Sequence, residues 1–514
     1  MAHTAPFVEG SLAKIIDFEA LSDEELQLSS AHTYWAYNAA DCLVTSEISS
    51  VLSKQLDKDT GWIYYFERSC LAPAMEMALR GILVDMVAKE DFVRRLSEES
   101  AKYDELLEAY GRALGHLDGI NANSTKQLKT IFYDQLKLPE QRKYDRAKKE
   151  EKISVDREAL EKLQLFKIAN PLVLAILGKR DCVKKLSVLR SGIDRDSRMR
   201  FSFNVGGTET GRWSSSRNAF GGGMNAQNLT EELRHIFISS PGKKLAYIDL
   251  EQAESRAVAY LSGDKGYQDA CNSGDLHTTV TRLIWPNKTW TGDFAHDRKL
   301  ADAPFYRQYS YRDMAKRGGH GSNYLGTPRT MAKHLKIEPK IMEDFQYGYF
   351  RAFPGIKEWH LKTATRLQST GSLTTPFGRR RPFLNRLSDN ATIREAVAFV
   401  PQSLIADYMN AGVCRLWAWG KVDLLAQIHD AVVFEYPEDQ DHLVLEASKI
   451  LSAEITLTNG DKFSIPSEPN VGWNWGKESE NNPLGLRKLK KGDDRKGPAR
   501  GHCAASDILG RVFR

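Results

Sequence analysis

The chain has 514 residues, of which 41% are hydrophobic and 27% are charged, so it can bury a sizeable core and is not a disordered chain. The 72 lysines and arginines barely exceed the 67 aspartates and glutamates, and the net charge of +5 permits a polyanionic partner without identifying one. No run approaches the ~18 consecutive apolar residues of a membrane span. The six cysteines are scattered and form no C-x-x-C pair, which argues against a disulfide framework or a zinc ribbon. Together these features predict a soluble cytoplasmic protein with no membrane partner.

Most of the first 200 residues are predicted to be helical. Residues 41–56 have the pattern of an amphipathic helix, and helix patterns rich in Lys and Glu run from residue 71 to about residue 166. The strongly charged run KYDRAKKEEK (143–152) is expected to be a solvated loop or linker. Helical character resumes at residue 156 and continues to about residue 189.

The pattern changes after residue 199. Ser, Thr, Gly and Asn dominate residues 199–240, which is typical of turns and loops. The segments most typical of strands are residues 245–248, 424–428 and 431–436, and the long region between the first two is predicted to be mostly helical. Residues 481–514 contain nine Lys or Arg and three Asp or Glu, and they are predicted to be a mobile basic tail.

Two aspartates lie at the ends of the predicted strands. Asp249 ends the first strand and is followed by a predicted helix that Gly263 terminates, whereas Asp430 lies with His429 in a tight turn between the other two strands. If the strand ends are neighbours, the two carboxylates repel unless a proton or a divalent cation neutralises them, and such oxygen-rich sites suit Mg²⁺. Each aspartate taken alone is more often a turn former or a helix cap.

A stripe of polar side chains is predicted further along the chain. Arg312, Lys316, His320 and Tyr324 are four residues apart, so on an α-helix they share one broad face about 18 Å long. Arg and Lys could hold phosphate oxygens, and Tyr could offer a flat face to a base. The glycine pair at 318–319 suggests a close approach by substrate or a bend in the helix. The alternative is an ordinary solvated helix face.

These segments resemble the motifs of the family A DNA polymerases, the DNA polymerase I family. DLEQAESR (249–256) resembles motif A, DYSQIELR; the spacing from Arg312 to Tyr324 resembles motif B; and QIHDAVVFE (427–435) resembles motif C, QVHDELVFE. Further segments resemble the family in the same order, so the resemblance covers about residues 70–476: EMALRGILVD (76–85), NANSTKQL (121–128), TETGRWSSS (208–216) with NAQNL (225–229), FGRRRP (377–382) and VGWNWG (471–476).

The resemblance implies an α+β multidomain fold, the right-hand polymerase, with an antiparallel palm sheet and a mostly helical thumb and fingers. The expected divisions are a remnant of a 3′–5′ exonuclease domain (1–68), the thumb (69–205), the first part of the palm with motif A (206–275), the fingers with motif B (276–374), the second part of the palm with motif C (375–480) and the basic tail (481–514).

The resemblance also implies roles for individual residues. Asp249 and Asp430 would be catalytic and would bind two Mg²⁺ ions together with the backbone carbonyl of Leu250. Glu254 would be a steric gate that fills the space of a ribose 2′-hydroxyl. The residues expected to bind the incoming nucleotide are Arg312 and Lys316 at the triphosphate, His277 in support, Tyr324 beside the nascent base pair, Glu254, Gln252 and His320. Those expected to contact primer or template DNA are Arg212, Gln227, Asn228, Gln402 and His429.

Some positions depart from the family pattern. His320 stands where motif B usually has Phe or Tyr near the sugar. Ala431 replaces the second acid of motif C, and activity is expected without it because both aspartates remain. Ala398 stands where the family often has Asn, which weakens the expected minor-groove contact.

The N-terminal part is short for an exonuclease domain. YNAAD (37–41) resembles the last exonuclease motif and Asp17 and Glu19 form a DxE, but Asp41 follows Glu19 by only 22 positions. The chain is therefore expected to lack its own proofreading. A separate exonuclease chain, as in a split polymerase, or a processivity factor is a candidate partner.

The function predicted on this resemblance is template-directed addition of dNTPs to a primer 3′-hydroxyl in DNA replication, by two-metal phosphoryl transfer. The alternatives are a single-subunit RNA polymerase and a catalytically silent DNA-binding subunit. The gapped similarity and the compact thumb resemble a bacteriophage replication enzyme more than a cellular repair enzyme, which would place the protein in a host cytoplasm.

Overall fold

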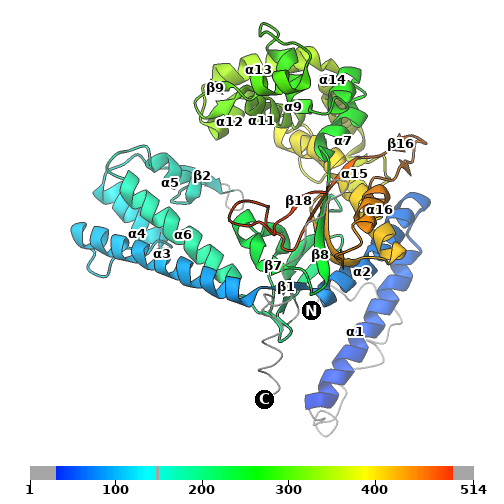
Figure 1. The fold of residues 1–514 in the computed structure, drawn as a ribbon, viewed down its shortest axis with the longest axis horizontal. Helices are drawn as coiled ribbons and strands as arrows, with labels where there is room; N and C mark the ends of the chain where they lie inside the picture. Colours follow the sequence, from blue (N-terminus) through cyan, green and yellow to red (C-terminus); the bar gives the residue numbers. More distant parts are fainter. Residues whose placement is uncertain (1–29, 146–149, 219, 490–514) are drawn as a thin grey trace.

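The computed structural model describes residues 30–145, 150–218 and 220–489, which form the three parts of a right hand (Figure 1). The thumb helices lie on one side, the fingers helices lie on another, and the palm sheet lies between and below them. This arrangement confirms the predicted α+β multidomain fold.

The palm is built on a five-stranded antiparallel sheet. Its strand order is β13-β14-β8-β17-β18, so strands far apart in the sequence are neighbours. The bounds of these strands are β8 Lys243–Leu250, β13 Asp423–Ile428, β14 Ala431–Pro437, β17 Ser467–Gly472 and β18 Arg487–Lys488. The three predicted strands are therefore confirmed, including the tight turn that joins β13 to β14.

Alternation along β8 separates the two faces of the palm sheet. Ala246, Ile248 and Leu250 are buried in a core that helices complete on one face, whereas Tyr247 and Asp249 point to the other face and are only half-buried. The helices that contribute to this core are α2 (Lys58–Arg80), α7 (Ala253–Ser262), α15 (Asn390–Trp419) and α16 (His442–Leu451).

The thumb is built around the long pair α3 (Met86–Ala113) and α6 (Asn170–Leu189), which pack along each other. Its shorter elements are α4 (Thr125–Lys129), a π-helix (Thr130–Gln135), β2 (Arg142–Asp145), β3 (Glu150–Ile153) and α5 (Arg157–Leu163). The prediction of a loop over residues 143–152 is wrong, because β2 and β3 pair there as an antiparallel ribbon. A two-stranded ribbon exposes both of its faces, so charged residues are tolerated at every position.

The fingers are helical, as predicted, and pack around a core that also includes Val258 and Ala259 of α7 and Val397 of α15. Their elements are α8 (Lys265–Cys271), α9 (Leu276–Ile284), α10 (Phe294–Ala301), β9 (Pro304–Tyr306), β10 (Tyr309–Ser310), α11 (Tyr311–Asn323), α12 (Pro328–Leu335), α13 (Pro339–Ala352) and α14 (Pro354–Thr370).

Short strands and 3₁₀-helices connect these parts. One three-stranded sheet has the order β4-β1-β7, and three hairpin-like pairs join β5 to β6, β11 to β12 and β15 to β16. Their bounds are β1 Ile82–Val84, β4 Arg198–Met199, β5 Phe201–Asn204, β6 Ser214–Arg217, β7 Phe237–Ile238, β11 Ser372–Thr374, β12 Arg380–Pro382, β15 Ile455–Thr456 and β16 Lys462–Phe463, with 3₁₀-helices at Ala226–Asn228 and Glu231–Ile236.

One helix crosses the expected boundary at residues 68 and 69. The boundary falls inside α2, whose residues Phe66 and Cys70 are both buried in the palm core, because their spacing of four places them on one face of the helix. The helix expected at 41–56 lies mostly within α1 (Ser30–Ser53), which contains Asp41. The predicted DxE at Asp17 and Glu19 lies outside the described residues.

The first part of the predicted basic tail also belongs to the palm. Asn470 of β17 pairs with Lys488 of β18, so the chain is ordered in the sheet as far as this pair, and the prediction of a mobile tail from residue 481 is wrong there. Residues 490–514 lie outside the described part of the chain. Among the helices of the described residues, none has the length and apolarity to cross a membrane.

Candidate active site between palm and fingers

The two aspartates lie on neighbouring strands of the palm sheet. Asp249 of β8 is directly opposite Ala431 of β14, and the backbone N–H of Leu250 donates to the carbonyl oxygen of Asp430 over 3.0 Å. The turn before β14 places His429 in the left-handed region, with φ of 56°. The backbone of the sheet therefore sets the relative positions of the two carboxylates.

Burial raises the proton affinity of both carboxylates. Burial, followed by the charge of Asp430 and that of Glu468, raises the pKa of Asp249 to about 7. Burial also raises the pKa of Asp430 above its ordinary value. Two buried carboxylates that disfavour their ionised forms are suited to a divalent cation, because the cation replaces the protons and stabilises both charges.

The donor set fits Mg²⁺ better than a metal that needs a closed protein cage. Among the described residues, no cluster of three or more His, Cys, Asp or Glu side chains could hold a metal. Mg²⁺ is commonly held by one or two carboxylates plus the phosphates of a substrate. Asp249 and Asp430 are thus the residues that could hold it, and Leu250 lines the same cavity.

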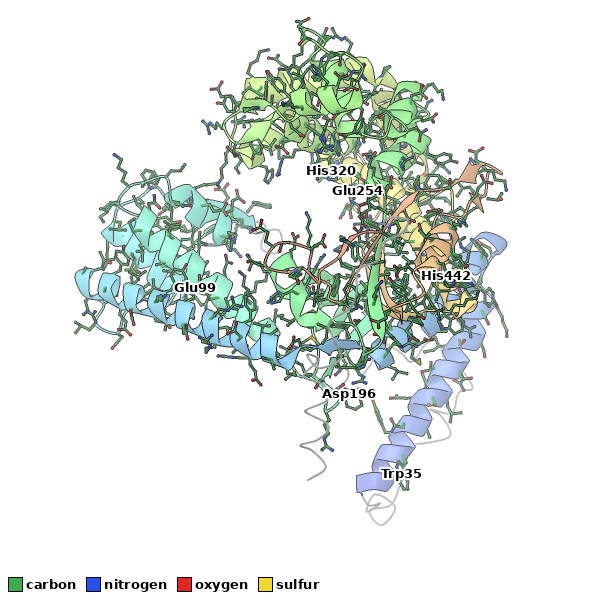
Figure 2. The ribbon with its side chains drawn as sticks, in the orientation of Figure 1. Trp35, Glu99, Asp196, Glu254, His320 and His442 are labelled. Carbon is green, nitrogen blue, oxygen red and sulfur yellow. The ribbon has the colours of Figure 1, made fainter. Side chains whose placement is uncertain are left out.

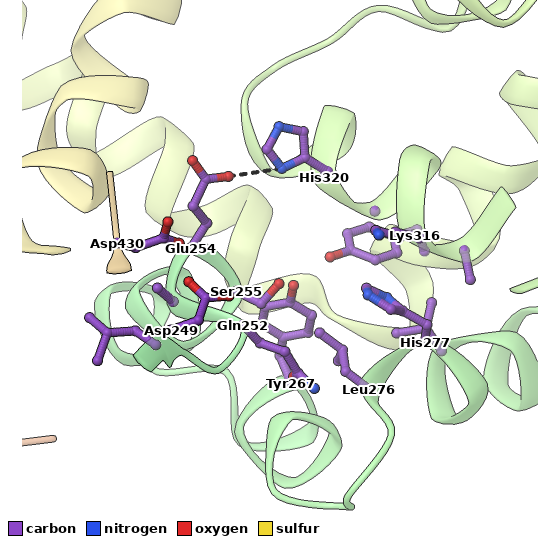
Figure 3. A pocket seen from close by; sticks show the side chains of 16 residues that line it. Asp249, Gln252, Glu254, Ser255, Tyr267, Leu276, His277, Lys316, His320 and Asp430 are labelled. Carbon is purple, nitrogen blue, oxygen red and sulfur yellow. Dashed lines mark ion pairs between the residues drawn. The ribbon is translucent and has the colours of Figure 1, made fainter. Parts of the chain in front are cut away.

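A cavity of about 270 Å³ lies between the palm and the fingers (Figure 3). One wall comes from β8, the start of α7 and the hairpin turn, and the other comes from α9 and α11. The cavity brings together eight of the residues singled out in the sequence: Asp249, Leu250, Gln252, Glu254, His277, Lys316, His320 and Asp430.

Glu254 is held by two basic side chains at the junction of palm and fingers (Figure 2). His320 Nδ1 lies 3.0 Å from one carboxylate oxygen and Arg212 Nη2 lies 3.4 Å from the other. Burial opposes ionisation of Glu254, but the hydrogen bonds and positive charges of His320 and Arg212 together outweigh it and lower the pKa of Glu254. The same hydrogen bond raises the pKa of His320. The carboxylate at the predicted gate position is thus fixed from both sides.

The helix that carries the polar stripe begins with a capping box. Ser310 and Asp313 exchange side-chain and backbone hydrogen bonds at the start of α11, which fixes the direction of the helix. Lys316 and His320 line the cavity from it. The helix ends at Asn323, so Tyr324 lies one residue beyond it and is half-buried. Burial is the main cause that raises the pKa of Tyr324, and the nearby negative charge of Glu254 adds to this effect.

Arg312 does not line the cavity, because its guanidinium is bound to Asp275. Nε and Nη2 of Arg312 donate to the two carboxylate oxygens of Asp275, each over 3.0 Å, and Arg298 Nη1 donates to the same group over 2.8 Å. Burial opposes ionisation, but the hydrogen bonds from Arg312 and Thr278 lower the pKa of Asp275 to about 2. Arg312 Nη1 remains free of this bidentate contact.

His277 is neutral near pH 7. Burial is the main cause that lowers its pKa to about 4, and the positive charge of Arg312 adds to the effect. A neutral imidazole keeps one N–H donor and one acceptor, so His277 can donate to a phosphate oxygen without adding a charge.

The glycine pair of α11 serves the packing of helices. A Cβ at Gly318 would lie 2.4 Å from the ring of Phe345, and a Cβ at Gly319 would lie 3.3 Å from the ring of Tyr349. Both rings belong to α13. The glycines therefore permit a close approach of α13, and Gly319 also borders the cavity. A close approach by substrate and a bend of the helix, the two roles expected from the sequence, stay predictions.

The residues expected to contact DNA lie outside this cavity. Gln227 uses its amide to donate to the carbonyl of Trp213 over 2.8 Å, whereas Asn228 is exposed. Gln402 is half-buried on α15, and His429 is exposed at the hairpin tip.

Sequence reasoning missed two acidic residues of this region. Asp275 caps α9, and the order D-L-H-T before an apolar helix face was a signal for this cap. Glu468 lies directly opposite Asp249 on β17. No local sequence pattern predicts that pairing, because the two strands are more than 200 residues apart in the chain.

Comparison with known proteins identifies the family. The description "DNA polymerase family A" matches residues 90–477, which include Asp249, Asp430 and the whole of α11. The chain belongs to DNA polymerase family A. The resemblance seen in the sequence is thereby confirmed.

Relatives within this family share moderate identity with the chain. The thermostable DNA polymerase I of Thermus filiformis is 30% identical over 456 residues, covering 84% of this chain and 50% of the relative. DNA polymerase I of Treponema pallidum is 28% identical over 468 residues, covering 86% of this chain and 43% of the relative. The chain thus spans about half the length of the curated relatives it matches.

A solved structure of the family shares the fold. The POL domain of Pol1 from M. smegmatis, in complex with a DNA primer-template and dNTP, superimposes with a TM-score of 0.68 at 22% identity. The match covers 85% of this chain and 74% of that one. It confirms the right-hand arrangement of palm, fingers and thumb.

Proposed function

We propose that this family A chain is a template-directed DNA polymerase that adds dNTPs to the 3′-hydroxyl of a primer in DNA replication. The observation that carries the proposal is the pair of aspartates on adjoining palm strands, at the floor of a cavity whose opposite wall presents Lys316 and His277. Phosphoryl transfer requires carboxylates that bind metal ions and, opposite them, groups that bind the phosphates of the substrate. The M. smegmatis relative was solved with primer-template and dNTP, which supports DNA and dNTPs as the partners here.

The chain's own residues bind and orient the reactants. Lys316, and Arg312 through the donors that Asp275 leaves free, attract the triphosphate, while neutral His277 donates a hydrogen bond. Asp249 and Asp430 hold negative charge where two Mg²⁺ ions fit. When bound there, the ions would lower the pKa of the primer 3′-hydroxyl and neutralise the leaving pyrophosphate.

Glu254 favours deoxyribonucleotides in this proposal. His320 and Arg212 fix its carboxylate, so a ribose 2′-hydroxyl would have to displace an ion-paired group. This is the observation that favours a DNA polymerase over a single-subunit RNA polymerase. Gln252 borders the same cavity, and Tyr324 lies next to it in position to flank the nascent base pair.

The DNA strands would lie along the palm, outside the nucleotide cavity. Asn228 and His429 are exposed for contact with primer or template, and Arg212 and Gln402 are partly accessible. Gln227 would need to exchange its bond to Trp213 for one to DNA. Three expectations from the sequence stay predictions. They are the lack of proofreading in this chain, a separate exonuclease chain or processivity factor as a partner, and a likeness to bacteriophage enzymes.

The proposal is tested by primer extension on a defined template with Mg²⁺, using either dNTPs or rNTPs. We expect Asp249→Ala and Asp430→Ala each to lower dNTP extension on the order of 1,000-fold or more, about 4 kcal/mol of transition-state stabilisation. EDTA should abolish wild-type extension. The matched control is Asp344→Ala, an exposed aspartate that pairs with Lys340 on α13 and should retain activity.

Other outcomes would select other functions. Equal extension with rNTPs and dNTPs would favour an RNA polymerase. Binding of primer-template without any extension, with or without added Mg²⁺, would favour a silent DNA-binding subunit.

A further inference from the structure

Two cysteine side chains from distant parts of the sequence are in contact inside the palm. Cys70 lies on α2 and Cys414 lies on α15, and these two helices pack side by side (Figure 1). Sγ of Cys414 is 3.5 Å from Sγ of Cys70, and both residues are free thiols in this structure. The two positions are 344 residues apart in the chain, so the fold alone brings the thiols together.

The two thiols differ in their access to solvent. Cys70 is 0% exposed and belongs to the palm core, whereas Cys414 is half-buried at the edge of that core. Sγ of Cys70 also donates to the carbonyl oxygen of Phe66 over 3.4 Å, which holds this thiol in the interior. A small reagent dissolved in water therefore reaches Cys414 first.

The surroundings of the pair favour the ionised form of Cys414. The hydrogen bond with Cys70 is the main cause that lowers the pKa of Cys414, against the effect of burial. Ser69, whose Oγ lies 3.8 Å from Cys414 Sγ, and the positive charge of Arg415 add to this effect. The hydrogen bond with Cys414, followed by burial, raises the pKa of Cys70. Because the thiolate is the nucleophile in cysteine oxidation, Cys414 is the reactive member of the pair.

The backbone near Cys70 allows the two sulfur atoms to approach each other. An S–S bond is about 2 Å long, so the sulfurs must move together by about 1.5 Å. Pro73 lies inside α2 and has no N–H, so the helix lacks the hydrogen bond to the carbonyl of Ser69, the residue before Cys70. A helix bends more easily where one of its hydrogen bonds is missing, and α2 can therefore take up this shift.

We propose that Cys70 and Cys414 are a redox modification site, at which a peroxide converts the two thiols into a reversible disulfide. An accessible thiolate beside a second thiol is the arrangement of redox-sensing cysteines. The proposal goes beyond the proposed function and does not depend on it, because neither cysteine lines the cavity between palm and fingers. It is also compatible with the scattered cysteines of the sequence, since intracellular disulfides of this kind are transient.

The reaction has two steps. The thiolate of Cys414 attacks one oxygen of the peroxide, the O–O bond breaks, and hydroxide leaves, so Cys414 becomes a sulfenic acid. The sulfur of Cys70 then attacks the sulfenic sulfur, an S–S bond forms, and the S–O bond breaks. The sulfenic hydroxyl leaves as water with the proton of Cys70, and the hydroxide takes up the proton that Cys414 lost. Two thiols thus give up two electrons, and hydrogen peroxide is reduced to two waters.

The first test identifies the bond in the wild-type protein. Folded protein is treated with hydrogen peroxide, the remaining thiols are alkylated after denaturation, and the chain is digested with trypsin. Cleavage after Lys and Arg places Cys70 in peptide 69–80 and Cys414 in peptide 395–415, each with a single cysteine. We expect these two peptides to be joined, with a mass lower by two hydrogen atoms than their sum, and to separate again in dithiothreitol. Cys182 and Cys271, which are buried, should remain thiols.

Two variants test the order of the steps. In Cys70→Ala the sulfenic acid of Cys414 has no second thiol to react with and should be trapped by dimedone. In Cys414→Ala the thiol of Cys70 should stay reduced. The matched control is Cys182→Ala, which shortens another buried cysteine and should still form the joined peptides.

Thermal unfolding measures what the bond does to the protein. A disulfide between α2 and α15 closes a very long loop, so peroxide should raise the unfolding midpoint of the wild type and of Cys182→Ala by about 2–4 °C. The midpoints of Cys70→Ala and Cys414→Ala should not rise.

Three results would overturn the proposal. The first is the absence of joined peptides at a peroxide dose that oxidises Cys42, which is exposed on α1. The second is conversion of Cys414 to a sulfinic acid in the wild type while Cys70 stays a thiol. The third is dimedone labelling of Cys70 in Cys414→Ala without labelling of Cys414 in Cys70→Ala, which would reverse the order of the steps. Primer extension measures a separate property, so failure of the proposed function would leave this inference intact.

Discussion

Asp275 organises the side of the fingers that borders the cavity without lining the cavity itself. It caps α9, the helix that carries His277, and it binds Arg312 of α11 and Arg298 of α10. Asp275 is only 5% exposed, so its negative charge is stabilised by these two arginines in place of water. One buried acid thus aligns three helices around the proposed triphosphate site.

We predict that Asp275→Asn destabilises the protein in a pH-dependent way. The folded pKa of Asp275 is about 2, below the unfolded value of about 4, so its ionised form stabilises the fold above about pH 4 and this contribution is lost as pH falls toward 2. Asn keeps the size and the cap but removes the charge. Urea unfolding should show a loss of about 1–3 kcal/mol at pH 7 that shrinks below about pH 4.

A matched control is Asp269→Asn, since Asp269 pairs with Lys265 on an exposed helix surface and should change stability by less than about 1 kcal/mol. A pH-independent loss in Asp275→Asn would contradict this account, because it would show that the loss does not come from the charge of the carboxylate.

The contact between α11 and α13 determines how closely the fingers helices can pack. Gly318 and Gly319 leave no side chain between α11 and the stacked rings of Phe345 and Tyr349, whose centres are 5.8 Å apart. Because α11 also presents Lys316 and His320, this contact sets the position of one wall of the proposed nucleotide cavity.

We predict that Gly318→Ala destabilises the fingers by about 1–3 kcal/mol through overpacking, although alanine favours a helix by about 1 kcal/mol over glycine. The comparison variant is Gly321→Ala in the same helix. Its Cβ would lie 2.6 Å from Cε of Met331, the flexible end of a side chain that can move aside, so its effect should be near zero. Thermal unfolding of both variants checks this, and equal effects would contradict the overpacking argument.

The elements that could be predicted from the sequence are those encoded by local patterns. The pattern of apolar strands joined by a two-residue turn predicted that Asp249 and Asp430 lie at neighbouring strand ends, as they do in the structure. The spacing of four residues predicted that Lys316 and His320 share one face of α11, and both line the cavity. Long-range pairing was not predictable in the same way. The binding of Arg312 to Asp275, the ribbon of β2 and β3, and β18 in the palm sheet all depend on partners that no local pattern specifies.

The N-terminal helix α2 is tied to the body of the palm by a buried charge cluster. Arg379 donates to Asp407 of α15 over 2.7 Å and to Glu67 of α2 over 2.5 Å. The Asp407 side chain is 0% exposed and that of Arg379 is 9% exposed. The cluster therefore joins three segments that are far apart in the sequence, and it explains why α2 belongs to the palm.

We predict that Arg379→Met destabilises the protein by about 3–5 kcal/mol, because it leaves Asp407 buried and unpaired. Adding Asp407→Leu should recover most of this loss, since an apolar pair of similar volume replaces the charges. Lys362→Met is the control, because Lys362 pairs with Glu358 on the exposed surface of α14 and should cost less than about 1 kcal/mol. Urea unfolding compares the four proteins, and a double variant no more stable than Arg379→Met would contradict this account.

The hydrogen bond from Leu250 to Asp430 ties both proposed catalytic aspartates to one ladder of the palm, whereas Lys316 and His320 belong to a helix of the fingers. In the proposed polymerase, a rotation of the fingers would change which of their groups meet the incoming nucleotide and leave the spacing of the aspartates as it is. Glu254, the proposed steric gate, would stay with the aspartates on the palm side. An engineer could therefore alter the contacts that α11 makes with a nucleotide while keeping the sugar gate and the residues proposed to join nucleotides.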